Sequence, residues 1–421
     1  MNFLKTSILS AISSIIKILS GIVVNKIIAI YIGPSGIALI GQFQSVLLII
    51  TTAGSGAINS GVTKYVAEYN QDSKRKNDIL NAGFIIMASS SIVFSIISFF
   101  SSSYMSVAVF GSDKYGVIFK VVAVSMIFIS LNNFLLAVLN GLKEIRAWIL
   151  ANIIGSILSL VITSILTIKY DMFGALFSTV LIQSLVLVVT LYFINKIKVF
   201  ANFKLGYRIS LKTYRKLFNY AIMAIVTALT IPIVQILIRN HLINNFSIEQ
   251  AGYWQAVTKI SDMYLLVITT ALSTYYLPRL SELTSKSDLN KEIISGYRII
   301  IPFVMLSALC IFFLRDFIIW LLFTPEFYAI KPLFTFQLIG DFFKMCSWTL
   351  SFLMIAKAMT KTFIVTEIIF SISLYVFSII LSNFFGLVGV TYAFALNYFI
   401  YLVTMIYLFS DILFKKRGKE N

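Results

Sequence analysis

Histidine and cysteine are nearly absent from this sequence. Its 421 residues include one histidine and two cysteines. Cys310 and Cys346 lie in separate apolar stretches, and two isolated cysteines form neither a disulfide framework nor a metal site. His241 follows Arg239 and Asn240 in a predicted loop, with no nucleophile or metal-binding residue near it in the sequence. The sequence therefore gives no indication of an enzyme that uses a metal or a catalytic histidine.

Charged residues are also scarce. They make up 12% of the chain, whereas hydrophobic residues make up 59% and the mean hydropathy is +0.93. Soluble domains contain about 25% charged residues, so this composition predicts a membrane protein with many spans. The net charge of +17 does not indicate nucleic-acid binding, because the basic residues lie in short loops beside apolar stretches rather than on one soluble face.

Apolar stretches long enough to cross a membrane recur along the chain. A helix needs about 20 residues to cross the hydrocarbon layer of a bilayer. The predicted spans are 8–32, 37–58, 79–100, 117–139, 148–168, 173–194, 217–238, 253–274, 297–314, 331–355, 362–382 and 387–409. No loop between them is long enough for a separate globular domain. The sequence therefore predicts an all-α polytopic membrane protein with 12 transmembrane helices in two six-helix lobes.

A basic connector, residues 196–216, separates the two sets of six spans. It carries Lys196, Lys198, Lys204, Arg208, Lys212, Arg215 and Lys216 and no Asp or Glu. The predicted domains are an N-terminal lobe, 1–195, a C-terminal lobe, 217–414, and a basic tail, 415–421. Lys and Arg close to a span are retained on the cytoplasmic side. Because most of the 34 basic residues share the side of the connector, both termini are predicted to be cytoplasmic.

The first predicted span contains two lysines. A charged side chain near the centre of an inserted helix costs about 2.5–3.5 kcal/mol on insertion scales, so it normally faces a water-filled cavity or a partner. Lys17 lies near the middle of the span, on a polar stripe that includes Asn25. Lys26 lies about 180° away from Lys17 around a straight helix, where its side chain can extend toward the far interface. Lys17 is the better candidate for lining a cavity.

The C-terminal lobe carries paired charges inside its predicted spans. The polar residues of the eighth, tenth and eleventh spans include Gln255, Lys259, Asp262, Gln337, Asp341, Lys344 and Glu367. A three-residue spacing brings Lys259 within reach of Asp262, and Asp341 within reach of Lys344. Two interpretations stay open: salt bridges that only hold helices together, or a solvated cavity to which all these charges belong. The cavity accounts more simply for the whole set together with Lys17.

A short internal similarity indicates two related lobes. The segment Tyr65–Tyr69 follows the second span, and a similar segment beginning with Tyr276 follows the eighth span, about half a chain length later. Both segments lie on the side predicted to be cytoplasmic. That placement is the one required by a parallel repeat about an axis along the membrane normal.

Several stretches, taken together, resemble a known family. They are Gly33-Pro34, Asn59–Ala67, Trp254–Val257 with Ile260–Asp262, Leu277–Ser281 and Leu314–Phe317. The chain resembles, over nearly its full length, the polysaccharide flippases of the multidrug/oligosaccharidyl-lipid/polysaccharide (MOP) exporter superfamily. The resemblance is greatest to the Wzx-type O-antigen flippases and their relatives for lipid III of enterobacterial common antigen.

The resemblance implies a V-shaped pair of lobes in the bacterial inner membrane. By alternating access, the lobes would move an undecaprenyl-pyrophosphate-linked O-antigen oligosaccharide to the periplasmic leaflet for lipopolysaccharide biosynthesis. The resemblance implies no cofactor. It implies a cavity with cationic residues for the pyrophosphate, and an O-antigen polymerase and a chain-length regulator are expected partners.

The buried charges agree with such a substrate. The predicted cavity residues for the pyrophosphate are Lys17, Lys26, Lys64, Lys259 and Lys344. Set against Asp262, Asp341 and Glu367, these lysines leave an excess of about two positive charges, which suits an anionic headgroup. A lysine is a point charge without the bidentate fork of arginine, so it would hold phosphate less rigidly and release it more easily.

The uncharged polar residues have two interpretations. Asn25, Gln42, Gln255 and Gln337 are candidates for contact with sugar hydroxyls, and helix packing is an equally good interpretation for the glutamines. The three acids are candidate carriers of a coupling proton or sodium ion. A nucleotide-driven mechanism is not expected, because the nearest approach to a phosphate-binding loop, Gly56–Lys64, lacks the Gly-Lys-Ser/Thr order.

Three other functions fit the sequence less well. A drug or cation antiporter of the same fold would favour an acidic, aromatic lumen, which the basic excess opposes. An oligosaccharide polymerase would carry a large periplasmic loop rich in Arg, His and acids, and the predicted loops here are short. A major-facilitator sugar porter would carry a Gly-x-x-x-Asp-Arg signature between the second and third spans, and the sequence lacks it.

Overall fold

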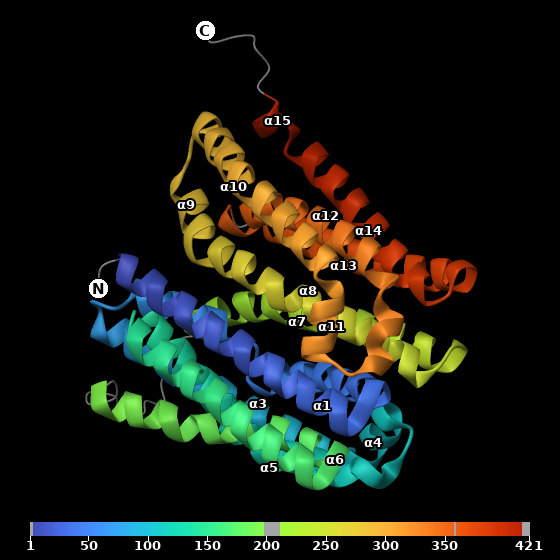
Figure 1. Cartoon of the computed structure of the whole chain (residues 1–421). Coiled ribbons are helices and arrows are strands. Elements are labelled where there is room, and N and C mark those ends of the chain that lie inside the picture. Colours follow the sequence, from blue (N-terminus) through green and yellow to red (C-terminus); the bar gives the residue numbers. More distant parts are fainter. Residues whose placement is uncertain (1–2, 198–210, 358, 415–421) are drawn as a thin grey trace. The chain divides into compact units, whose positions relative to one another are not determined.

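The computed structural model describes residues 3–197, 211–357 and 359–414, and every regular element in these ranges is a helix (Figure 1). Within the described ranges, nine helices are long and apolar enough to cross a membrane. The predicted fold class, an all-α multi-pass membrane protein, is confirmed.

The helices follow one another with short connections. The first part of the chain forms α1 (Phe3–Gly54), α2 (Asn59–Glu68), α3 (Ser73–Phe100), α4 (Ser102–Phe110), α5 (Gly116–Gly141) and α6 (Ile145–Ile197). The second part forms α7 (Leu211–Asn245), α8 (Ile248–Ala271), α9 (Leu277–Glu282), α10 (Lys286–Phe313), α11 (Arg315–Leu322), α12 (Leu333–Ala356), α13 (Thr360–Phe385), α14 (Leu387–Leu408) and α15 (Ser410–Leu413). A π-helical turn, Leu272–Tyr276, joins α8 to α9.

Two of the long helices each contain two predicted spans. In α1 the spans meet at Gly33, whose φ of 70° lies in the left-handed region that glycine adopts readily, and Pro34 follows without an N–H for the helix. In α6 they meet at Tyr170 and Asp171, where the backbone leaves the helical conformation. The eighth predicted span lies in α8, which is less apolar than the other spans because it carries several charged residues.

The contacts divide the chain into two compact units, Met1–Ile233 and Val234–Asn421. Helix α7 begins in the first unit and ends in the second, and Pro232 lies next to the division. The division falls later than the predicted connector because Leu217 belongs to the apolar core of the first unit. Residues 198–210 of the connector and the tail 415–421 lie outside the described residues, so the predicted domain boundaries remain predictions.

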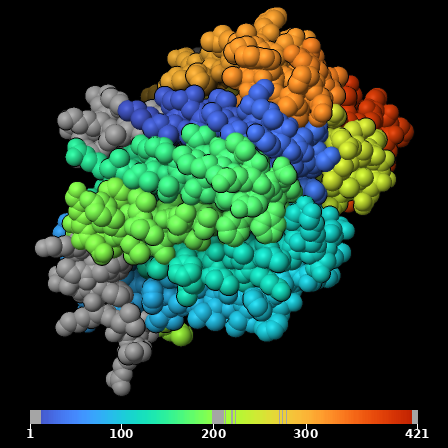
Figure 2. All heavy atoms as spheres, turned by 60° about the horizontal axis from the view of Figure 1, so that its bottom comes forward, coloured from blue at the N-terminus to red at the C-terminus, as the bar shows by residue number. Residues whose placement is uncertain are grey.

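Each unit has its own apolar core. In the first unit α1 packs along α6, and α5 packs against both α3 and α6. Figure 2 shows α1 in blue and α6 in green lying side by side on one face. In the second unit α12 and α13 both pack against α14, and α10 packs against α12. The core residues include Val62 and Phe134 in the first unit and Ile293 and Met345 in the second.

The outer surface of both units is apolar. Many large apolar side chains are exposed, among them Phe100 (83%), Phe313 (77%) and Phe384 (78%). Helices can present such residues to lipid because their backbone hydrogen bonds are satisfied internally. Serine and threonine side chains likewise bond within their own helix, as Thr51 does to the carbonyl of Leu47 at 2.8 Å. These features are those of helices surrounded by hydrocarbon.

Candidate functional site

The predicted polar residues of α1 differ in exposure. Lys17 is exposed, midway along the first segment of α1, and Lys26 is partly buried. Asn25 and Gln42 are only 6% and 1% exposed, so both side chains are buried. Among these four residues, Lys17 is therefore the one whose side chain is available at the surface of the unit.

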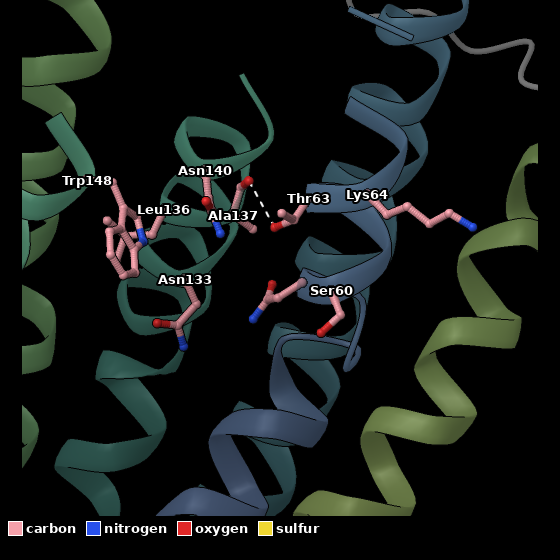
Figure 3. A pocket seen from close by; sticks show the side chains of 9 residues that line it. Ser60, Thr63, Lys64, Asn133, Leu136, Ala137, Asn140 and Trp148 are labelled. Atoms are coloured by element: carbon pink, nitrogen blue, oxygen red, sulfur yellow. Dashed lines mark hydrogen bonds between the residues drawn. The ribbon is translucent and has the colours of Figure 1, made fainter. Parts of the chain in front are cut away.

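Lys64 lies at the edge of a pocket within the first unit. The pocket has a volume of about 450 Å³ and is lined by Asn59, Ser60, Thr63, Lys64, Asn133, Leu136, Ala137, Asn140 and Trp148 (Figure 3). These residues come from α2, α5 and α6, and Thr63 ties two of the helices together by donating to the carbonyl of Ala137 at 3.1 Å. Lys64 is the only one of the predicted site residues that lines this pocket.

Lys64 also belongs to a cluster of cations on two tyrosine rings. Tyr65 and Tyr69 stack with their centroids 6.0 Å apart, and the ammonium of Lys64 lies 5.1 Å from the Tyr65 ring. Lys216 donates to the Tyr69 hydroxyl at 2.5 Å, and the Arg75 guanidinium lies 5.7 Å from the same ring. The hydrogen bond to Tyr69 raises the pKa of Lys216. Three positive groups therefore gather at the end of the first unit that is predicted to be cytoplasmic.

Arg239 and His241 correct the sequence prediction, which placed both in a loop. Both lie within α7, which continues past the apolar run to Asn245. Arg239 is 0% exposed and donates to Oε1 of Gln255 at 2.5 Å, with its guanidinium 5.7 Å from the Trp254 ring. His241 makes a 2.9 Å hydrogen bond with the Ser382 hydroxyl. A buried arginine is costly unless it is paired, so Gln255 has a structural role beside any contact with a sugar.

Asp341 is buried and held by hydrogen bonds from neutral groups. Its carboxylate is 0% exposed and accepts from the Ser261 hydroxyl at 2.6 Å, the Tyr264 hydroxyl at 2.9 Å and the Gln337 amide at 3.4 Å. Hydrogen bonds of this kind stabilise a buried carboxylate. The predicted salt bridge between Asp341 and Lys344 is not among the ion pairs formed by the described residues.

Lys344 lies instead among aromatic rings. Its ammonium is 4.9 Å from the Trp348 ring, 5.7 Å from Tyr398 and 5.8 Å from Phe394. The negative faces of aromatic rings attract a cation, most strongly when it is shielded from water. The charge of Lys344 also acts on Asp341 and on two further acids, Asp262 and Glu367.

Lys259 and Asp262 are close but differ in exposure. Lys259 is partly buried, whereas Asp262 is exposed. The charges of Arg239 and Asp262 both act on the ammonium of Lys259. Their predicted salt bridge is also not among the ion pairs of the described residues. Those ion pairs lie near helix ends, and the pair of Arg279 with Glu282 is one example. Two polar positions on one helix thus face different surroundings.

The second unit brings most of the predicted polar residues into one cluster. We call Arg239, Gln255, Lys259, Asp262, Gln337, Asp341, Lys344 and Glu367 the charge cluster. Its three cations balance its three acids, because Arg239 adds a charge that the sequence analysis had assigned to a loop. With Arg239 counted, the excess is three positive charges rather than two, and it lies on Lys17, Lys26 and Lys64 of the first unit.

The residues that shape the pocket of the first unit are not among the predicted site residues, apart from Lys64. Asn132 and Asn133 lie in the fourth predicted span and Asn140 lies just beyond it, and three amides in a mostly apolar stretch are a visible signal. Arg239 was missed because the predicted span ended one residue before it. When the last turn of a helix is polar, hydropathy does not show where the helix ends.

These features define a class of protein. The protein is a multi-pass membrane protein whose spanning helices carry ionisable side chains. This is the architecture of a membrane transporter. The chain belongs to the polysaccharide biosynthesis protein family, which matches residues 3–284. It is 30% identical over 401 residues to the Lipid III flippase of Escherichia coli (strain K12). The match covers 95% of this chain and 96% of that protein. The Lipid III flippase of Shigella flexneri matches to the same extent.

Solved structures show the same fold. An inward-facing multidrug resistance MATE family transporter of the MOP superfamily matches with a TM-score of 0.76 and 14% identity over 96% of both chains. The Lipid II flippase MurJ in its inward closed conformation matches with a TM-score of 0.73 and 17% identity, covering 97% of this chain and 87% of that one. The predicted resemblance to polysaccharide flippases is confirmed, and the fold is the one seen in a transporter of the MOP superfamily.

Proposed function

We propose that this protein is a flippase that carries a lipid-linked oligosaccharide from one leaflet of a membrane to the other. The observation that carries the proposal is the similarity to the Lipid III flippases, which extends over 95% of the chain. Membership of the polysaccharide biosynthesis protein family supports the same class of substrate. The protein acts as a transporter and not as an enzyme.

The distribution of charge suits this substrate. A pyrophosphate and its sugars cannot cross hydrocarbon unaided, whereas the polyprenyl tail can remain in it. The head therefore needs cations and polar groups at membrane depth. Lys17 is exposed midway along a spanning segment, and Lys64 is exposed on α2, so both are available to an anionic headgroup. Lys26 and the two lysines of the charge cluster are further candidates.

The substrate that we favour is an undecaprenyl-pyrophosphate-linked O-antigen repeat unit. It would move from the cytoplasmic to the periplasmic leaflet of the bacterial inner membrane by alternating access, with both termini in the cytoplasm. An O-antigen polymerase and a chain-length regulator would use the product. The second candidate substrate is lipid III, the lipid in the names of the two matching relatives. A drug or cation antiporter is a weaker alternative, because the similarity to the MATE transporter lies in the fold.

A flipping assay tests the proposal. Purified protein in proteoliposomes would receive fluorescent polyprenyl-pyrophosphate carrying either an O-antigen repeat or the oligosaccharide of lipid III, and an impermeant reagent would report which leaflet holds the sugar. We expect protein-dependent flipping of one or both lipids, and the faster one identifies the substrate. If the lipids flip at equal rates with and without protein while the protein exchanges a fluorescent cationic drug, the antiporter would replace the flippase as the proposed function.

A further inference from the structure

The pocket between α2, α5 and α6 has a chemistry that the proposed function does not yet use. Three asparagine amides, Asn59, Asn133 and Asn140, line it together with the indole of Trp148. Figure 3 shows Asn133, Asn140 and Trp148 on one side and Ser60 on the other, with the Lys64 side chain extending away from them. No acidic side chain lines the pocket. Its volume of about 450 Å³ falls within the roughly 300–1,000 Å³ of small-molecule sites.

One amide oxygen of this pocket lacks a hydrogen-bond partner in the part of the chain that the structure describes. The Oδ1 atom of Asn59 is buried and has no hydrogen-bond partner among the described residues. Buried polar atoms are nearly always bonded, and a rotation of the Asn59 side chain, which lines the pocket, would present this oxygen to a donor there. Thr63, by contrast, is satisfied by the carbonyl of Ala137 and has a structural role.

The set of groups selects one kind of ligand. An amide side chain offers two donors and one acceptor and so matches a hydroxyl group, which both donates and accepts. The flat face of an indole suits the C–H face of a pyranose ring, while a polar edge of the same ring can meet the amides. Without an acid the pocket does not suit a metal or an organic cation. Its single charge, Lys64, lies at the edge and suits an anion attached to the ligand.

We propose that this pocket is a subsite for one uncharged pyranose ring of the lipid-linked oligosaccharide. Trp148 would stack on the sugar, and the amides of Asn59, Asn133 and Asn140 would bond its hydroxyls. The cluster of Lys64, Lys216 and Arg75 on Tyr65 and Tyr69 would lie beside it for the phosphates. The substrate assignment rests on the proposed flippase function, whereas the binding of a sugar to this pocket does not.

Saturation-transfer NMR on the full-length protein in nanodiscs tests sugar binding directly. The probes are methyl glycosides of glucose, galactose and mannose together with N-acetylglucosamine. We expect at least one of them to receive saturation at its ring protons, and Trp148→Ala or Asn133→Leu to weaken its binding about tenfold. Trp320→Ala, at an exposed tryptophan of α11, and Asn245→Ala, at the end of α7, are matched controls that retain the signal.

Two further measurements keep the outcomes distinct. Trp148→Phe retains an aromatic face and is expected to keep part of the binding, which guards against misfolding of the alanine variant. In proteoliposomes, Asn133→Leu is expected to slow the flipping of the sugar-bearing lipid and not of sugar-free polyprenyl pyrophosphate. If the wild type transfers no saturation to any of the probes, or if the pocket variants bind and flip like the wild type, the subsite is refuted while the flippase stands. If sugar binding depends on Trp148 but the wild type flips neither lipid, the flippase fails and the subsite stands.

Discussion

At the scale of single residues, Lys17 is the cation most directly available for the proposed substrate. It lies midway along the first segment of α1 and is exposed there. At this depth an exposed side chain is surrounded by hydrocarbon unless water or a polar group lies next to it. A charge kept in such a place indicates contact with water, an anion or both. The role of Lys17 in binding pyrophosphate remains a prediction.

Replacing Lys17 by alanine is expected to slow flipping by about tenfold or more, because a hydrogen bond to a charged group contributes roughly 1.5–3 kcal/mol. The flipping rate in proteoliposomes checks this, with the amount of protein in the membrane measured by immunoblot. Lys17→Arg keeps the charge and should retain most activity. Lys120→Ala removes an exposed lysine of α5 that lies over Phe99, and should flip normally. Normal flipping by Lys17→Ala would contradict the role.

The charge cluster allows a second test at this scale. Combining Lys259→Asp with Asp262→Lys exchanges two charges that have different neighbours. Lys259 interacts electrostatically with Arg239, and Asp262 interacts with Lys344. We expect the double variant to fold and to lose flipping. Exchanging Lys286 and Asp411 instead, an exposed ion pair at 3.8 Å, should change little. Retained flipping after the first exchange would show that transport does not depend on which of the two positions carries which charge.

At the scale of elements, the same tight turn occurs in both units. In α6 a Cβ atom added to Gly174 would meet the carbonyl oxygen of Leu166 at 1.9 Å, and at the start of α14 one added to Gly389 would meet that of Leu381 at 2.1 Å. A residue with φ in the left-handed region precedes each glycine by three positions: Asp171 and Gly386. The repeated turn supports the related halves that the Tyr65 and Tyr276 segments indicate.

Gly389→Ala is therefore expected to lower the free energy of unfolding by at least about 2 kcal/mol, because the clash is with backbone and no side chain can move to relieve it. Denaturation of the purified protein by sodium dodecyl sulfate measures the change. Gly111→Ala is the control: its φ is 68° but nothing lies within 4 Å, so backbone strain alone should cost about 1–2 kcal/mol. Equal losses in the two variants would show that crowding at Gly389 does not matter.

At the scale of the whole molecule, the two units carry different kinds of charge. The first unit holds the lysines without balancing acids among the predicted site residues, and the second holds the balanced charge cluster. We interpret the first as suited to an anionic headgroup and the second as suited to a coupling ion. Asp262, Asp341 and Glu367 are the candidate carriers of a proton or a sodium ion.

Flipping is accordingly expected to respond to an imposed pH or sodium gradient across the proteoliposome membrane. Asp341→Asn keeps an acceptor for Ser261 and Tyr264 but cannot change its charge, so it should flip without responding to the gradient. The assay compares initial rates with the gradient inward, outward and absent. Rates that ignore both gradients in the wild type would remove ion coupling and leave the gradient of the substrate itself as the driving force.

The sequence by itself determined the fold class and the family, and it predicted the positions of the spans. These follow from local properties, because bilayer thickness fixes the length of an apolar span and unpaired backbone groups cannot remain in hydrocarbon. It also placed Lys17, Lys64 and the acids of the charge cluster in or beside spans.

Only the tertiary structure decided which groups meet. Asp341 is held by Ser261 and Tyr264 of another helix, and Lys344 lies on rings that include Tyr398 of α14. The pocket near Trp148 exists because three helices come together around it. Helical periodicity fixes the face of its own helix on which a side chain lies, whereas close packing between helices selects the faces that come into contact.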